Sequence, residues 1–286
     1  MGNALRWSVL AAAAMTVMST GSEASAEPVT EFDLQSHRGG RGETTEESLR
    51  AFAKSIELGV STLELDIVIS ADRQPMVWHD PIVQADKCAD TTPAFADDPQ
   101  YPYVGKLVHD LTLEQLRTLD CGKLLPAFPH AEVVAGNRMA TLPEVFALAD
   151  QYRADVRYNI ETKVEADRPE MSAPPEQFVE VILAAVRAAG ESDLVEIQSF
   201  DWRTLPMVRA AAPDVPLVAL WDATTWVPGS PWLAGIDPAV VGDPIAAAMS
   251  VGATILSPGF SVPYWQPRAD PGASLAAEAD LATRTP

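Results

Sequence analysis

Two histidines and two carboxylates in the first third of the chain have residue types and spacing that could carry out proton transfer beside a bound cation. His37 and His79 each close an apolar run that is typical of a β-strand. Glu64 and Asp66 lie two residues apart in a third such run, so in a strand their side chains share a face. Two carboxylates on one face repel each other, and a bound hard cation is the usual solution. The sequence therefore predicts a cation site flanked by two histidines at neighbouring strand ends.

The order of these motifs resembles the glycerophosphodiester phosphodiesterase family. Residues 37–42 read H-R-G-G-R-G, residues 64–66 read E-L-D, and residues 79–80 read H-D, with a helical segment between the first two motifs. Further along, Glu161-Thr162-Lys163 resembles the strand-borne E-x-K of the family, and Ser199-Phe200 resembles its S-F turn. The resemblance implies an α/β fold, a TIM (β/α)8-type barrel, with the functional residues at the C-terminal ends of the strands.

The resemblance extends from about Gln35 to about Phe260 and has two departures. Thr45-Glu46-Glu47-Ser48 stands where the family usually has P-E-N-T, so only the acidic residue Glu46 is kept. The family's C-terminal strand with tryptophan and threonine is absent. We identify seven strands where a closed barrel has eight, and we therefore expect the domain at residues 27–286 to lack the eighth strand and the last helices.

Eight residues have expected roles. The resemblance implies that Glu64, Asp66 and Glu161 are the metal ligands and that His37 and His79 are the acid and base, and we expect Arg38, Lys163 and Ser199 to bind the substrate. The chemistry agrees, because an anionic phosphodiester needs charge neutralisation by a cation and basic groups, and histidine has a pKa near neutrality. Ligands that are all oxygen favour Ca²⁺ or Mg²⁺ over zinc.

Simpler interpretations of three of these residues stay open. Lys163 could pair only with Glu161, Arg38 could pair only with Glu46, and Ser199 could be a turn residue. The sequence does not distinguish which histidine is the acid and which is the base.

Apolar segments with alternating periodicity predict the βα repeats that would position these residues. The expected strands are residues 32–37, 62–69, 75–79, 156–163, 194–200, 217–221 and 254–257. The expected helices are residues 44–58, 142–152, 174–189, 202–212 and 245–250. Strands that alternate with helices at this spacing indicate a parallel sheet.

Residues 81–138 interrupt this alternation and predict an insertion after the third strand. The segment is rich in Asp, Pro and Gly, and we expect one short helix at Thr112–Leu119, with Thr112 at its start and Glu114 in its first turn. Both cysteines, Cys88 and Cys121, lie in the insertion. In an exported protein, two cysteines in one irregular segment predict a disulfide.

The N-terminal segment predicts export. Arg6 precedes the apolar run of residues 7–18, and Ala24-Ser25-Ala26 is a small-residue cleavage signature, so residues 1–26 resemble a signal peptide. The apolar run is too short for a comfortable membrane span. We therefore expect a secreted or periplasmic protein without stable membrane insertion.

The composition limits the class of partner. The chain of 286 residues has 40 acidic and 20 basic residues and a net charge of -20. This charge argues against nucleic acid or an anionic membrane surface as a standing partner and leaves a small-molecule substrate. It says nothing about the oligomeric state.

These observations favour metal-dependent hydrolysis of glycerophosphodiesters to glycerol 3-phosphate and an alcohol. One alternative is phospholipase D-like cleavage of choline phospholipids or sphingolipids, although the acidic chain offers few basic or apolar loops for a membrane surface. Another alternative is a non-catalytic binder of a phosphodiester cell-wall polymer. The presence of both histidines and all three carboxylates argues against the second alternative.

Overall fold

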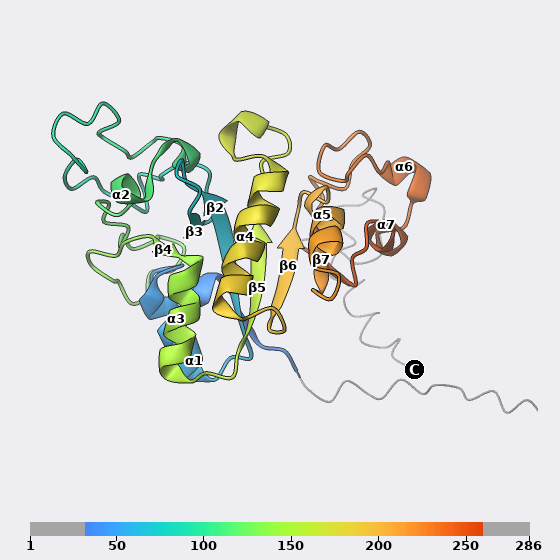
Figure 1. The fold of residues 1–286 in the computed structure, drawn as a ribbon, viewed down its shortest axis with the longest axis horizontal. Helices are drawn as coiled ribbons and strands as arrows, with labels where there is room; N and C mark the ends of the chain where they lie inside the picture. Colours follow the sequence, from blue (N-terminus) through green and yellow to red (C-terminus); the bar gives the residue numbers. More distant parts are fainter. Residues whose placement is uncertain (1–31, 260–286) are drawn as a thin grey trace, which may run out of the picture. The chain divides into compact units, whose positions relative to one another are not determined.

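The computed structural model describes residues 32–259 (Figure 1), so both the expected signal peptide and the C-terminal tail lie outside the described residues. Eight strands form one sheet, in the order β4-β3-β2-β5-β6-β7-β8, and β1 also pairs with β2. The strands are β1 (Gln35–Ser36), β2 (Thr62–Ile69), β3 (Pro75–Val77), β4 (Ala140–Thr141), β5 (Arg157–Thr162), β6 (Val195–Ser199), β7 (Leu217–Trp221) and β8 (Ile255–Pro258).

Six of the described strands run parallel, as a barrel-type βα repeat requires. β1 pairs with β2, and β2, β5, β6, β7 and β8 follow one another in parallel register. The predicted α/β class with a barrel-type repeat is confirmed. Within residues 32–259, β1 and β8 do not pair with each other, and the prediction about a missing eighth strand falls on residues beyond this range.

The helices between the parallel strands pack side by side along the sheet. In Figure 1, α3, α4 and α5 stand next to one another in front of the strands, and α1 contacts α3 in turn. The α-helices are α1 (Leu49–Leu58), α2 (Leu113–Leu116), α3 (Leu142–Tyr152), α4 (Pro175–Ala189), α5 (Thr204–Ala211), α6 (Pro238–Val241) and α7 (Pro244–Ser250). Short 3₁₀ turns are η1 (His37–Gly39), η2 (Val108–Asp110) and η3 (Pro169–Met171).

Local sequence explains where the helix that follows the glycine-rich loop begins and ends. The Ser48 side chain accepts a hydrogen bond from the Ala51 amide and caps α1, which therefore begins at Leu49 and not at the predicted Thr44. Gly59 adopts a left-handed conformation with φ of 81° and ends the helix. The residues before Ser48 are thereby left in a loop beside the sheet.

The central strand β2 is buried along its whole length and divides its side chains between two environments. Leu63, Leu65 and Ile67 join the main hydrophobic core under the helices. Glu64 and Asp66 alternate with them and lie on the opposite face. One face of β2 therefore stabilises the fold, and the other carries the carboxylates.

The third strand differs from the prediction in its direction. β3 is antiparallel to β2, with Ile69 opposite Pro75, because only residues 70–74 connect the two strands. A connection this short allows a hairpin, whereas a parallel strand needs a long crossover. β4, which was not predicted, adds to β3 in the same antiparallel sense. The parallel βα repeat is therefore interrupted directly after β2. The interruption includes β3 and β4, which are both antiparallel additions to the sheet.

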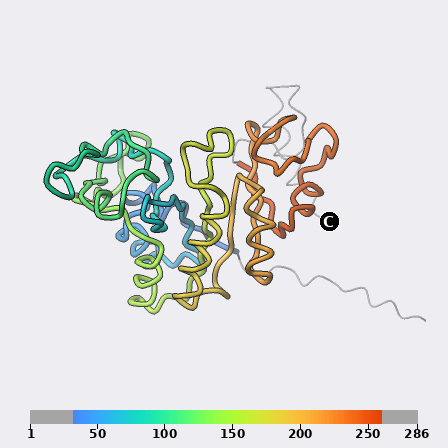
Figure 2. The backbone as a smooth tube through the Cα atoms, turned by 45° about the horizontal axis from the view of Figure 1, so that its top comes forward, coloured from blue at the N-terminus to red at the C-terminus, as the bar shows by residue number. Residues whose placement is uncertain are grey.

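The segment between β3 and β4, which we call the insertion, has its own small hydrophobic core. Tyr103, Leu111 and Leu116 are fully buried in it and pack with Val68 and Met76 at the edge of the sheet. Figure 2 shows this segment in blue-green to green, gathered together beside β2 and β3. The insertion is therefore a packed unit attached to the sheet edge.

The structure joins Cys88 and Cys121 in the predicted disulfide. The predicted short helix is present as α2, capped by Thr112, but the reciprocal cap comes from Gln115 and not from Glu114. No helix of the described residues is long and apolar enough to cross a membrane.

Candidate active site

The ends of β1, β2, β3 and β5 bring the predicted polar residues to one place. His37 follows β1, Glu64 and Asp66 lie within β2, and His79 comes two residues after β3. The β2–β5 register places Asp66 opposite Glu161, so their side chains share a face. This gathering is the arrangement predicted from the alternating strand pattern.

Glu64, Asp66 and Glu161, which we call the acidic cluster, have the geometry of a cation site. Each of the three offers a carboxylate oxygen, and these oxygens all lie within 4.8 Å of one another. All three side chains are buried. Asp66 Oδ2 is buried and has an ion pair with Arg38, but it accepts no hydrogen bond from the described residues. Buried carboxylates this close need a positive charge between them, so the residues present fit a hard divalent cation with oxygen ligands.

Hydrogen bonds fix Glu64 from two sides. The Arg38 backbone N–H donates to Oε2 over 2.7 Å, and Nε2 of Gln198 donates to Oε1 over 2.7 Å. Gln198 was not predicted as a site residue. It is the neighbour of Ser199 on β6, and the β5–β6 register that places it opposite Glu161 could not be read from the sequence.

Arg38 and Lys163 lie against the acidic cluster. Arg38 Nε is 3.2 Å from Asp66 Oδ2, and Lys163 Nζ is 2.8 Å from Glu161 Oε1 and 3.8 Å from Asp66 Oδ1. The ion pairs that were the simpler interpretation are therefore present, including an Arg38 contact of 3.4 Å with Glu46. The two basic groups could also face a bound phosphate from these positions.

The pKa values of the three carboxyl groups in the acidic cluster shift in different directions, although all three groups are buried. Burial raises the pKa of Glu64 well above its usual value, and the negative charge of Asp66 adds to this. Burial also raises the pKa of Glu161 to about 7, against the opposing charge of Lys163. For Asp66, burial raises the pKa, but Lys163, His79 and Arg38 outweigh it and hold the pKa below its usual range. The three carboxyl groups therefore resist ionising together unless a positive charge lies between them.

The environment of both histidines lowers their pKa values. Desolvation and the positive charge of Arg38 lower the pKa of His37 to about 4. Burial lowers the pKa of His79, although a hydrogen bond to Asp80 works in the opposite direction. His79 Nδ1 lies 2.9 Å from Asp80 Oδ1, so this carboxylate orients the ring and leaves Nε2 for proton transfer.

A second group of charges surrounds Glu46, and we call Glu46, Asp80, Arg38, Arg41 and Lys87 the Glu46 network. Glu46 contacts Lys87 Nζ at 2.5 Å and Arg41 at 2.9 Å. Lys87 also contacts Asp80 at 2.5 Å, and its ammonium lies 5.1 Å from the centre of the Trp78 ring. Lys87 was not predicted, because nothing in the composition of the insertion marks one lysine as buried.

Glu47 occupies a different environment from its neighbour. Its side chain is buried, and its carboxyl oxygens meet no N–H donor among the described residues but lie beside the Asp66 carboxyl. Burial and the nearby charge of Asp66 raise the pKa of Glu47 well above its usual value. Sequence reasoning noted this residue only as a departure from P-E-N-T, and its position beside Asp66 could not be seen before the loop was placed.

Ser199 has the contacts of a turn residue, which was the simpler interpretation from the sequence. Its hydroxyl accepts from Thr162 over 2.7 Å and donates to the Asp201 carbonyl over 2.9 Å, and the side chain is fully buried. The physical reason is strand alternation, since Gln198 takes the inner face and the next residue must take the other. Ser199 therefore stabilises the turn after β6.

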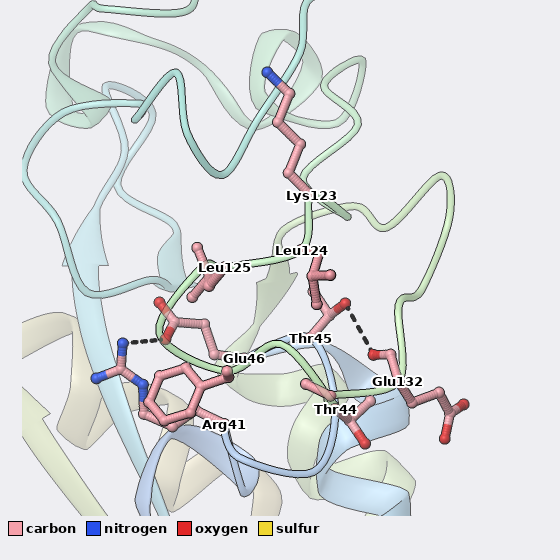
Figure 3. A pocket seen from close by; sticks show the side chains of 10 residues that line it. Arg41, Thr44, Thr45, Glu46, Lys123, Leu124, Leu125 and Glu132 are labelled. Carbon is pink, nitrogen blue, oxygen red and sulfur yellow. Dashed lines mark hydrogen bonds and ion pairs between the residues drawn. The ribbon is translucent and has the colours of Figure 1, made fainter.

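A small hollow lies beside Glu46 and is lined by residues 41, 44–46, 123–125, 128 and 131–132. Figure 3 shows Arg41 and Glu46 joined by an ion pair at one wall, and Thr45 donating to the Glu132 carbonyl at another. The Arg41 guanidinium lies 4.6 Å from the centre of the Phe128 ring. The hollow therefore lies where the glycine-rich loop meets the second half of the insertion.

Comparison with known proteins agrees with this geometry. A model of the glycerophosphoryl diester phosphodiesterase family matches residues 37–248. The chain belongs to this family. It is 29% identical over 186 residues to the glycerophosphodiester phosphodiesterase of Caldanaerobacter subterraneus subsp. tengcongensis. The aligned part spans 65% of this chain and 65% of that relative, slightly less than two thirds of its length.

Solved structures of the family show the same fold. A candidate glycerophosphoryl diester phosphodiesterase of Silicibacter pomeroyi DSS-3 matches with a TM-score of 0.64 and 26% identity, over 78% of this chain and 73% of that one. A phosphodiesterase of Oleispira antarctica, solved with its product sn-glycerol-3-phosphate, matches with a TM-score of 0.56 over 79% and 74% of the chains. At 18% identity the second likeness shows the fold alone. The chain thus has the TIM-barrel fold of this family.

Proposed function

We propose that the protein hydrolyses glycerophosphodiesters to glycerol 3-phosphate and an alcohol, with a divalent cation, Ca²⁺ or Mg²⁺, held by Glu64, Asp66 and Glu161. The observation that carries the proposal is the meeting of this buried acidic cluster with His37 and His79 at neighbouring strand ends. Family membership supports the reaction class.

The side chains have separate roles in this proposal. One histidine accepts a proton from the attacking water, and the other donates a proton to the departing alcohol oxygen, so a P–O bond to water forms as the P–O bond to the alcohol breaks. Arg38 and Lys163 stabilise negative charge on the phosphoryl oxygens. A cation bound at the acidic cluster would neutralise further phosphate charge and let the carboxylates stay ionised together.

The surroundings of the two rings support acid–base chemistry by this pair, which needs one neutral ring to accept a proton and one protonated ring to donate it. A ring that is neutral at pH 7 can accept a proton, and the hydrogen bond of Asp80 to His79 would stabilise that ring once it is protonated. The product bound in the Oleispira antarctica structure is consistent with the substrate class, as is the name of the Caldanaerobacter relative.

The deciding experiment measures turnover of glycerophosphocholine and of sphingomyelin, each with added Ca²⁺ or Mg²⁺ and with chelator. We expect turnover of glycerophosphocholine that chelator removes and the cation restores. Preference for sphingomyelin would favour the phospholipase D-like alternative. A protein that binds a cation but turns over neither substrate would contradict the proposal and favour a binding role.

We also propose that the protein is exported and cleaved after Ala26. The support is the Arg6 start, the apolar run and the small residues at 24–26, together with a disulfide that persists in oxidising compartments. Mass measurement of the protein recovered outside the cytoplasm should give a chain that begins at Glu27. Recovery of the uncleaved chain in the cytoplasm would contradict export.

A further inference from the structure

Lys87 is a largely enclosed lysine that the proposed mechanism leaves unused. It lies in the insertion, its side chain is 12% exposed, and its ammonium contacts the carboxylates of Glu46 and Asp80 over 2.5 Å each. An enclosed ammonium is costly unless charged partners surround it. Asp80 is also the partner of His79, so Lys87 is separated by one side chain from a ring that the proposed mechanism uses.

The two oxygens of Asp80 have different partners. Oδ1 lies 2.9 Å from His79 Nδ1, and Oδ2 accepts from Lys87 Nζ over 2.5 Å. Because the carboxylate is a rigid plane, a contact that holds one oxygen also restricts the direction of the other. Among the residues that the structure describes, Lys87 is the only lysine or arginine that forms an ion pair with Asp80. The orientation of Asp80 toward His79 therefore depends on Lys87.

The carboxylate of Glu46 makes this dependence stronger. The same Nζ atom of Lys87 contacts both Glu46 Oε1 and Asp80 Oδ2, so the two carboxylates lie close together against one positive charge. Without that charge the two carboxylates would repel each other. Glu46 would keep two arginine partners, so Asp80 is the carboxylate that would turn away and lose its alignment with His79.

The fold of the insertion holds Lys87 at this position. The Lys87 carbonyl accepts from the Lys123 amide over 3.2 Å, and the next residue, Cys88, is buried and joined to Cys121 by the disulfide. The Lys87 ammonium also lies 5.1 Å from the centre of the Trp78 ring, at the distance of a cation–π contact. The backbone and the end of the side chain are therefore both fixed.

We infer that Lys87 is a positioning residue for His79 and acts through Asp80. Lys87 holds Asp80 Oδ2, and Asp80 Oδ1 accepts from Nδ1–H of His79, which leaves Nε2 of the ring for proton transfer. This inference rests on the proposed function, because it gives Lys87 a part in the reaction through His79.

The first test is turnover of glycerophosphocholine in the presence of the cation. Lys87→Met should lower kcat about tenfold or more and change KM little, because it disturbs a group that orients the reacting ring. Lys87→Arg should recover most of the lost kcat, because it keeps a positive charge beside Asp80. The matched control Lys106→Met removes a lysine of the same insertion that contacts Gln100, and it should keep the kcat of wild type.

A loss of stability has to be distinguished from a loss of positioning. Lys87→Met also removes two ion pairs, so kcat is compared at a temperature at which circular dichroism shows every variant folded. Lys87→Gln takes its place if Lys87→Met does not fold. Asp80→Asn should lower kcat as well, and the double variant should lower it no further, because two residues that act in series are not additive.

Nitrogen-15 NMR of the His79 ring gives a readout that does not need activity. At a pH where the ring is neutral, Nδ1 should carry the proton in wild type, because it faces a carboxylate. In Lys87→Met the ring signals should shift toward a mixture of the two tautomers, and in Lys87→Arg they should stay near those of wild type. His79→Ala identifies the signals.

The outcomes separate this inference from the proposed function. If wild type hydrolyses glycerophosphocholine and Lys87→Met keeps its kcat and its His79 signals, the inference is wrong and the proposed function stands. Losses of kcat that add in full in the double variant would also overturn the inference. If wild type turns over no glycerophosphodiester, the role in the reaction is wrong together with the proposed function. A lower kcat with shifted His79 signals, both restored by Lys87→Arg, supports the inference.

Discussion

Two buried groups of charges meet at Arg38, and they are balanced in opposite ways. In the Glu46 network, Glu46 and Asp80 face Arg38, Arg41 and Lys87, and every carboxylate has a basic partner. In the acidic cluster, the three carboxylates outnumber the two basic groups, and among the described residues Glu64 has no ion pair with a basic side chain.

The pKa shifts show the consequence of this difference. Burial raises the pKa of Glu46, but Lys87, Arg38 and Arg41 more than compensate and leave it lowered. Burial raises the pKa of Glu64, and the charge of Asp66 raises it further. A network whose charges balance within the protein stabilises a loop, whereas a cluster with excess charge is suited to binding an ion. The following predictions test that division.

The largest effect should come from the histidines, which lie beside the acidic cluster. His37→Ala or His79→Ala should lower turnover of glycerophosphocholine by about 10²–10⁴-fold, because a positioned acid or base is lost. Circular dichroism should confirm that the fold is kept. Wild-type turnover by His79→Ala would remove that residue from the mechanism.

Loss of one carboxylate of the acidic cluster should weaken cation binding directly. Glu64→Gln should bind Ca²⁺ or Mg²⁺ at least about 10–100-fold more weakly, the range seen even for residues that only support ligands. Calorimetry measures this without relying on activity. If Glu64→Gln were fully active in excess chelator, the cation site would have to be abandoned.

In the Glu46 network, the effect should fall on stability. Lys87→Met removes the cation shared by Glu46 and Asp80, and breaking buried ion pairs costs about 3–5 kcal/mol. Urea unfolding should show this loss, and cation affinity measured by calorimetry should stay near that of wild type. Glu180→Gln breaks an exposed pair with Arg73 and should change the unfolding free energy by less than about 1 kcal/mol. A large loss of cation affinity in Lys87→Met would show that the two groups of charges are not separate.

The smallest effect should be a pH dependence of stability carried by His37. Its pKa is about 4 in the folded protein and near 6.5 in the unfolded chain, so between these values the unfolded chain binds the extra proton. Stability should therefore fall as the pH is lowered from about 6.5 toward 4. Because His37 is exposed to solvent, we expect about 1 kcal/mol or less of this loss to come from it. Urea unfolding at pH 7 and pH 5 should show a smaller difference for His37→Gln than for wild type, and equal differences would contradict the assignment.

The sequence predicted the part of the site that depends on strand alternation. Glu64 and Asp66 had to share a face of β2, and Glu161 and Lys163 had to lie together at the end of β5, because the side-chain period of a strand is two. His37 and His79 followed from the apolar runs that they close. These features are local, so a pattern of residues was enough.

The features that were missed depend on pairing between distant segments. Gln198, and not Ser199, faces Glu64 because of the β5–β6 register, which the sequence does not specify. Lys87 reaches Glu46 only because the insertion folds back onto the glycine-rich loop. The direction of β3 was the exception, since the five residues before it already required a hairpin.

The pairing of β2 with β5 has a consequence for the fidelity of folding. Asp66 lies opposite Glu161, and a slip of one residue would turn the side chains of a whole strand to the other face. Such a slip would bury Glu161 among the core residues and separate it from Asp66. Because a cation would bind only the correctly paired state, its presence should shift the population toward that pairing. The same three carboxylates would then help to select the alignment of the sheet in which they meet.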